Sequence, residues 1–133
     1  MPSNMLTATR AMAKDHWLGL LEKLLNEIQG WTEKQHWPVI SQDKQVTEKS
    51  LGTYDTRDLV IKAPGGTLLI EPVAHDVPNS DGRVDISSFP SMHRMLLIRN
   101  RGNWQLYTDS GVAWPKKWNR ETFIEVAKIL TTA

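Results

Sequence analysis

The first thirty residues of the chain place apolar side chains at helical spacing. Between residues 9 and 29 one broad face collects Trp17, Leu20, Leu21, Leu24, Leu25 and Ile28. Glu22, Lys23 and Glu27 lie on the opposite face, which is the pattern of a helix that covers a core. Gly30 tolerates the left-handed backbone that often ends a helix. The pattern therefore predicts a helix over residues 9–29 that ends at Gly30.

From residue 58 onward the pattern changes to short apolar runs separated by turn residues, which is typical of antiparallel strands. Residues 58–62 and 67–71 flank Pro64-Gly65-Gly66, and proline followed by glycine predicts a hairpin with a type II turn. A third short run, residues 83–86, follows the turn signal of residues 79–82.

A second hairpin is predicted where residues 95–98 and 104–107 flank Asn100-Arg101-Gly102-Asn103. Gly102 is expected to take a positive φ, because glycine has no Cβ to clash in that conformation. The pattern is weaker before the first hairpin. Residues 41–45 are polar and aperiodic, so we expect a loop there and a first strand near residues 46–54.

The last part of the chain predicts a second helix. Asn119 is a good N-cap, and Glu121 in the first turn suits the positive end of the helix dipole. An apolar stripe at i, i+3, i+4 and i+7 follows, made by Phe123, Val126, Ala127 and Leu130. Trp118 directly precedes the N-cap and is expected to pack on Phe123 as a hydrophobic staple.

Together these elements predict one α+β domain over residues 1–133. We expect an N-terminal helix, a mostly antiparallel sheet of about five strands and a C-terminal helix. The 133 residues suit a single core, and 40% hydrophobic with 23% charged residues is an ordinary globular composition.

Composition and charge exclude several classes of function. Sixteen Lys and Arg residues against fifteen Asp and Glu residues leave a net charge of +1, which argues against nucleic acid as a partner. The chain has no cysteine, which excludes disulfides, thiolate catalysis and cysteine-bound zinc. Charges interrupt the apolar first helix, and residues 1–10 lack the pattern of a signal peptide. We therefore expect a cytoplasmic protein without membrane association, and the sequence leaves its oligomeric state open.

Four carboxylates and one imidazole are concentrated between residues 71 and 85. They are Glu71, His75, Asp76, Asp81 and Asp85. Such groups can bind a divalent metal or act as acid and base, with His75, Asp81 and Asp85 as the candidate residues. A calcium loop does not fit, because Val77 and Ser88 stand where its first and last acids belong. A polar turn explains the group more simply, so we predict neither a metal nor a cofactor.

Asp85 is the one member of this group that lies inside a strand run. In metal-dependent nucleases an acid at such a place works with an acid and a lysine on the next strand. Here residues 95–99 contain no acid and end in Arg99. We therefore expect Asp85 to point to solvent or to form an ion pair with Arg83 or Arg99.

Tryptophan is unusually frequent, with six residues against two Phe and two Tyr. The most distinctive segment is Trp114-Pro115-Lys116-Lys117-Trp118. Pro115 keeps Trp114 out of the following helix, and both lysines must keep their charges near water. Because rigid aromatic side chains are enriched at binding hot spots, we predict partner contacts at Trp114, Lys116 and Lys117.

Three functions remain open from the sequence. We favour a small non-enzymatic domain that binds another protein, because no catalytic motif is present. The alternative is a small metal-dependent or hydrolytic enzyme that uses His75, Asp81 and Asp85. A third hypothesis is a small-ligand pocket that tryptophans line between the sheet and the helices.

Overall fold

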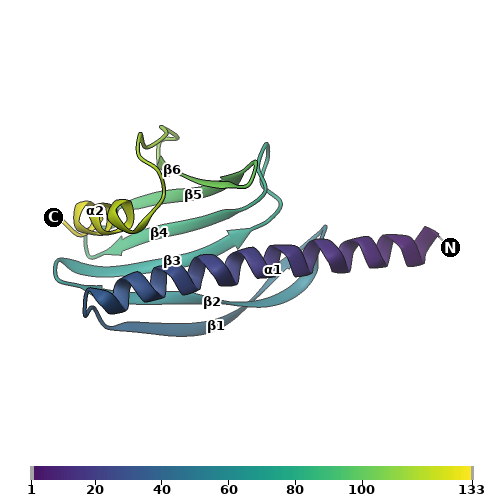
Figure 1. Ribbon diagram of the computed structural model, residues 1–133, viewed down its shortest axis with the longest axis horizontal. Helices are drawn as coiled ribbons and strands as arrows, with labels where there is room; N and C mark the ends of the chain where they lie inside the picture. Colours follow the sequence, from purple (N-terminus) through teal and green to yellow (C-terminus); the bar gives the residue numbers. More distant parts are fainter. Residues whose placement is uncertain (1, 133) are drawn as a thin grey trace.

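The computed structural model describes residues 2–132, with side chains described from residue 9 to residue 132. Six strands form one antiparallel meander in the order β1-β2-β3-β4-β5-β6, and a helix stands at each end (Figure 1). The bounds are α1 Pro2–Lys34, β1 Val39–Glu48, β2 Gly52–Ala63, β3 Gly66–Ala74, β4 Arg83–Phe89, β5 Arg94–Asn100, β6 Asn103–Thr108 and α2 Arg120–Thr131. The expected single α+β domain is confirmed, with six strands rather than about five.

Both helices contribute to one hydrophobic core on the same face of the sheet (Figure 1). Alternate residues of β3, β4, β5 and β6 and of the inner half of β2 point into that core, as the period of two in a strand requires. The largest fully buried side chains are Trp17, Phe123, Leu21, Leu24, Leu25, Ile28, Leu59, Ile61, Leu68, Ile70, Ile86 and Leu97. The expected burial of Trp17 and of the apolar face of the first helix is confirmed.

The predictions failed at the first strand. Residues 41–45, expected to be a loop, lie inside β1, and the expected strand at residues 46–54 is interrupted by the turn between β1 and β2. β1 is an edge strand, so it pairs on one side only and most of its side chains are exposed. Exposed strand positions accept polar residues, and for this reason the apolar alternation that marks a strand is missing.

The end of α1 was also placed wrongly. The helix continues through Gly30 to Lys34, and the left-handed residue that follows it is His36, with φ of 60°. Contacts beyond Gly30 explain the extension. Trp31 lies against Trp118 and Phe123, with ring centroids 5.6 and 5.9 Å apart, and tertiary packing outweighs the helix-breaking tendency of glycine.

Both predicted hairpins form, as β2–β3 and β5–β6. Gly102 has φ of 82°, which confirms its predicted role in the second turn. The prediction of a type II turn in the first hairpin is wrong. Such a turn needs a positive φ at Gly65, and Gly65 is not among the glycines with positive φ. Its small size is required instead by α2, since a Cβ at Gly65 would lie 2.8 Å from Thr131 Oγ1.

The second helix matches its prediction closely. The Asn119 side chain caps α2 by accepting from the Thr122 backbone N–H, and the predicted apolar stripe is buried. Trp118 packs edge-on against Phe123 with ring centroids 6.0 Å apart, so the predicted staple is confirmed.

The β1–β2 hairpin is longer than the part of it that joins the sheet. Its pairs run as far as Glu48↔Gly52, whereas β2 pairs with β3 only from Leu59↔Ile70 onward. Trp17 of α1 packs beside this outer half of the hairpin, where its indole N–H donates to the hydroxyl of Tyr54 at 3.1 Å. The hairpin thus extends the core along the helix.

Candidate functional site

A groove of about 580 Å³ lies where α1, the start of β6 and the segment before α2 meet. We call it the tryptophan groove. It is lined by Glu27, Gly102, Asn103, Trp104, Gln105, Lys117 and Trp118. These residues come from three parts of the chain that are far apart in sequence, and only Lys117 belongs to the residues that the sequence predicted as partner contacts.

The two indoles of the tryptophan groove are half-buried and supported from behind. Trp104 lies 6.3 Å from the Trp17 ring, and Trp118 lies 5.6 Å from the Trp31 ring and 6.0 Å from Phe123, all between centroids. Side chains held in this way lose little conformational freedom when a ligand covers them. The groove therefore offers a preorganised aromatic surface.

Positive charge dominates around the tryptophan groove. The Arg99 guanidinium lies over the Trp104 ring, 5.6 Å from its centroid, and Arg101 stands in the adjacent turn. Within residues 9–132, neither arginine forms an ion pair, and neither does Lys117. Among the residues whose side chains are described, Glu27 is the one acid that lines the groove. The groove wall itself carries one cation, Lys117, and one acid, Glu27, and the two arginines beside Trp104 add the positive charge that favours an anionic ligand.

The structure places Trp114 and Lys116 outside the tryptophan groove. Trp114 is half-buried, and its backbone N–H donates to the Leu106 carbonyl at 2.8 Å. The Gln105 side chain donates to the Trp114 carbonyl at 2.7 Å, so this segment covers the free edge of β6. Lys116 is engaged by Glu125, with 2.6 Å between Nζ and Oε2. Trp114 therefore packs along β6 and Lys116 is paired with Glu125, and neither lines the tryptophan groove.

His75 belongs to a different cluster, at the outer end of the β1–β2 hairpin. Its ring packs edge-on against Trp17, and its Nδ1 lies 3.2 Å from Asp76. Asp76 also accepts from the Ser50 hydroxyl at 2.5 Å, and Glu48 accepts from the backbone N–H groups of His75 and Asp76 at 2.8 to 2.9 Å. These bonds tie the loop after β3 to the hairpin.

Two pKa values in this cluster are shifted for physical reasons. Hydrogen bonds from Ser50, and a smaller effect of His75, hold the pKa of Asp76 below its ordinary value of 3.8. Burial, together with the hydrogen bond to Glu48, raises the pKa of Tyr54 far above its ordinary 10.0. Tyr54 therefore stays protonated and donates to the Glu48 carboxylate at 2.5 Å.

Asp85 and Asp81 do not join His75. Asp85 alternates with the core residues Val84 and Ile86, so it faces away from the helices, whereas His75 contacts Trp17 on the helix side. Asp81 is exposed in the turn before β4. The three candidate residues of the enzyme hypothesis are therefore not assembled into one site.

The environment of Asp85 was only partly predicted. The expectation that it points to solvent is wrong, because the residue is only 4% exposed. The predicted pair with Arg83 is confirmed, with 2.7 Å between Nε and Oδ1, but the second cation is Arg94 at 3.6 Å rather than Arg99. Both partners neutralise a buried carboxylate, which is a structural arrangement.

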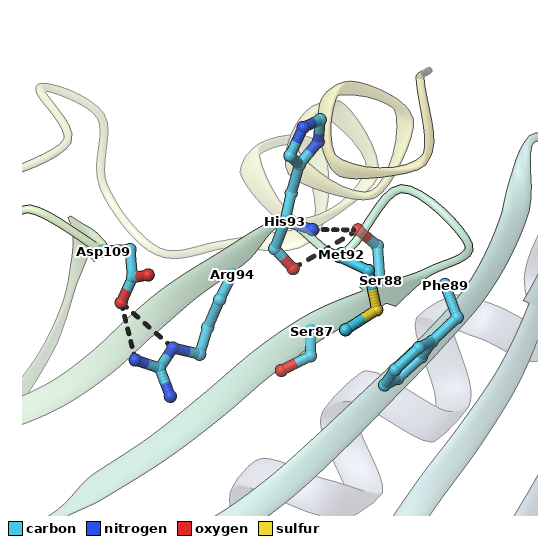
Figure 2. A pocket seen from close by; sticks show the side chains of 7 residues that line it. All are labelled: Ser87, Ser88, Phe89, Met92, His93, Arg94 and Asp109. Carbon is cyan, nitrogen blue, oxygen red and sulfur yellow. Dashed lines mark hydrogen bonds and ion pairs between the residues drawn. The ribbon is translucent and has the colours of Figure 1, made fainter.

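A smaller pocket of about 260 Å³ opens beside the β4–β5 turn (Figure 2). Several of its polar groups are already engaged in hydrogen bonds. The Arg94 guanidinium donates to Asp109 at 2.8 Å, and the Ser88 hydroxyl accepts from the His93 backbone N–H at 3.1 Å (Figure 2). His93 Nδ1 lies 3.2 Å from the Leu130 carbonyl. The bond to Leu130 connects the β4–β5 turn to α2, and the side chains of Arg94, Asp109 and Ser88 are held by hydrogen bonds within the fold.

Among the described residues, no group of three or more His, Asp or Glu side chains is placed to hold a metal ion. In the same part of the chain, no helix is both long and apolar enough to cross a membrane. Comparison with protein-family models, with curated proteins and with solved structures found no match. The geometry of the tryptophan groove is therefore the main basis for a functional proposal.

Proposed function

We propose that the protein is a non-enzymatic binding module whose tryptophan groove takes an acidic peptide segment of a partner protein. The observation that supports this proposal is the meeting of two supported indoles with Lys117 on the groove wall and Arg99 and Arg101 beside it, none of which forms an ion pair within residues 9–132. An apolar or aromatic anchor of the peptide would cover Trp104 and Trp118, and its carboxylates would lie near Lys117 and the β5–β6 turn.

The net charge of the whole chain indicates that an acidic ligand would be recognised locally, by the cations around the tryptophan groove. A net charge of +1 makes general attraction to polyanions weak, so recognition has to come from the groove itself. We further propose the cytoplasm as the compartment, because a chain without cysteine gains no disulfide bond from an oxidising compartment.

A peptide library displayed on phage tests this function without knowledge of the partner. Selection on the immobilised protein should enrich sequences in which acidic residues stand near an aromatic or large aliphatic residue. The best peptide, labelled with a fluorophore, is then titrated with protein and followed by anisotropy. No enrichment, or enrichment of basic peptides, would overturn the proposal.

Two adjacent lysines supply a matched pair of variants. Lys117→Glu places an acid on the groove wall and should weaken binding of the selected peptide by about tenfold or more. Lys116→Glu makes the same change of net charge outside the groove, beside Glu125, and should change the affinity by less than about twofold. Equal losses in both variants would mean that the peptide senses only overall charge.

A further inference from the structure

The two edges of the sheet differ in whether another segment forms hydrogen bonds along them. Residues 112–114 run along β6 and bond to it, through Thr108 N–H to the Val112 carbonyl and Trp114 N–H to the Leu106 carbonyl, each at 2.8 Å. β1 forms the other edge and pairs only with β2, along ten consecutive residue pairs from Val39↔Ile61 to Glu48↔Gly52. Within the described chain, nothing pairs with its outer side.

The backbone groups on the free side of β1 can be assigned from the register. The Lys62 N–H donates to the Pro38 carbonyl at 2.8 Å, and Pro38 and Lys62 continue the β1–β2 pairing. Hydrogen-bonded positions alternate along an antiparallel pair, so the even-numbered residues of β1 bond to β2. The N–H and C=O groups that face outward are those of Val39, Ser41, Asp43, Gln45 and Thr47.

β1 has few of the features that usually prevent a sheet edge from pairing with another strand. A protected edge is short, bulged, covered or carries an unneutralised lysine. β1 has ten residues and no break in register, and its one lysine is engaged. Lys44 Nζ lies 3.0 Å from Asp58 and donates to the Pro72 carbonyl at 2.9 Å. Ile40 stands 55% exposed on the same strand.

We propose that β1 is the interface of a homodimer, in which two copies pair their β1 strands antiparallel around a two-fold axis at Gln42. A two-fold axis perpendicular to the sheet makes any central residue face its own copy. An axis at Asp43 or Lys44 sets like charges opposite each other, which is unfavourable. An axis at Gln42 pairs Ile40 with Lys44 and Ser41 with Asp43, and it opposes two neutral amides at the centre.

This register also agrees with the exposed apolar surface. Ile40 lies beside Val60, and Val60 beside Leu69, on the face that the helices leave uncovered. In the dimer Ile40 lies opposite Lys44 of the second copy, whose ammonium stays with Asp58 and Pro72, so the backbone and the first methylene groups of that lysine cover part of Ile40. Val39 to Gln45 take part, so the paired segment ends before Val46 and Glu48, whose side chains turn toward the core and the Tyr54 cluster.

The pairing predicts a reversible dimer. A seven-residue strand contact buries less than the roughly 1,200 Å² typical of stable complexes, so we expect monomers at about 1 μM and dimers at about 200 μM. Sedimentation equilibrium of the full chain over that range measures the association. A protein that stays monomeric throughout would overturn the proposal.

Single-cysteine variants test the register, because the natural chain contains no cysteine. Gln42 is a non-hydrogen-bonded position with its copy, where the Cα atoms lie about 4.5 Å apart, within the range of a disulfide. Gln42→Cys should therefore form a disulfide-linked dimer under mild oxidation. Gln45→Cys is the matched control, since its two copies would stand about 20 Å apart. Crosslinking of Gln45→Cys but not of Gln42→Cys would refute this register.

A proline at Ser41 tests the edge itself. The Ser41 N–H faces outward, so Ser41→Pro removes a donor of the dimer and leaves the β1–β2 hydrogen bonds in place. We expect this variant to keep the circular dichroism spectrum and to lose at least tenfold in association constant. Ser41→Ala is the control, because it removes the hydroxyl that accepts from Arg57 at 3.2 Å but keeps the N–H. A proline variant that dimerises like the alanine variant would exclude this edge.

Discussion

Gly82 and Trp17 form the contact in this fold that should be least tolerant of change. Gly82 has φ of 149°, in a region that residues with a Cβ avoid, and it lies directly under the Trp17 ring. A Cβ built on it would stand 2.3 Å from two carbons of that ring. Ordinary contact begins near 3.4 Å, so the ring or the backbone must move by about 1.1 Å, the difference between these distances.

Trp17 has little freedom to give way. The residue is 0% exposed, and its indole N–H is held by Tyr54. Positive φ costs an alanine about 1–2 kcal/mol, and overpacking of a core costs about 1–3 kcal/mol. Gly82→Ala should therefore lower the free energy of unfolding by about 2–5 kcal/mol. Gly102→Ala is the matched control, since Gly102 has φ of 82° but no atom within 4 Å of its built Cβ, and it should lose only about 1–2 kcal/mol.

Urea unfolding followed by far-ultraviolet circular dichroism measures both losses. A second variant tests the mechanism, because Trp17→Leu in the Gly82→Ala background gives the added Cβ more room. The two changes should then show a favourable coupling in a double-mutant cycle. If Gly82→Ala costs no more than Gly102→Ala, or if the cycle shows no coupling, the steric argument is wrong.

Three other predictions concern the tryptophans and the cluster around His75. Trp118→Ala should destabilise the protein by about 2–3 kcal/mol and Trp114→Ala by about 1 kcal/mol in thermal unfolding, because only the first leaves a gap in an aromatic cluster. The lowered pKa of Asp76 means that its contribution to stability is present above pH 3.8 and is lost as the pH falls through the lower, folded value. Urea unfolding of Asp76→Asn should accordingly show a flatter pH dependence in that acid range than the natural chain. In Tyr107→Phe, the remaining phenol of Tyr54 should ionise in an ultraviolet titration only together with alkaline unfolding, and ionisation while the fold persists would contradict its raised pKa.

Local signals in the sequence explain which elements were predictable. The second helix carries its own information, in the N-cap Asn119 and in a stripe that needs no knowledge of the rest of the chain. The turn at Gly102 is equally local. Gly30 and Gly65 led to wrong predictions, because residues distant in sequence decide their conformation. Trp118 packs at the end of the first helix, and Thr131 packs against the turn of the first hairpin.

The candidate site follows the same division. The segment around Lys117 was recognisable from its composition, but the other walls of the tryptophan groove, Trp104 and Glu27, come from elements whose neighbours only the fold decides. Glu48 gave no signal at all, since it reads as one charge in a polar strand. Its importance arises from the backbone N–H groups of His75 and Asp76, which the fold brings to it.

The aromatic contact between the two helices has a consequence for synthesis on the ribosome. Trp31 meets Phe123 across 92 positions of the chain, the difference between their numbers. At about 5–20 residues per second, α1 leaves the ribosome roughly 5–20 s before its partner in α2 exists. Its apolar stripe has no complete core to enter during that interval. We therefore expect nascent chains that end before residue 120 to bind hydrophobic-segment chaperones, and full-length chains to be released from them.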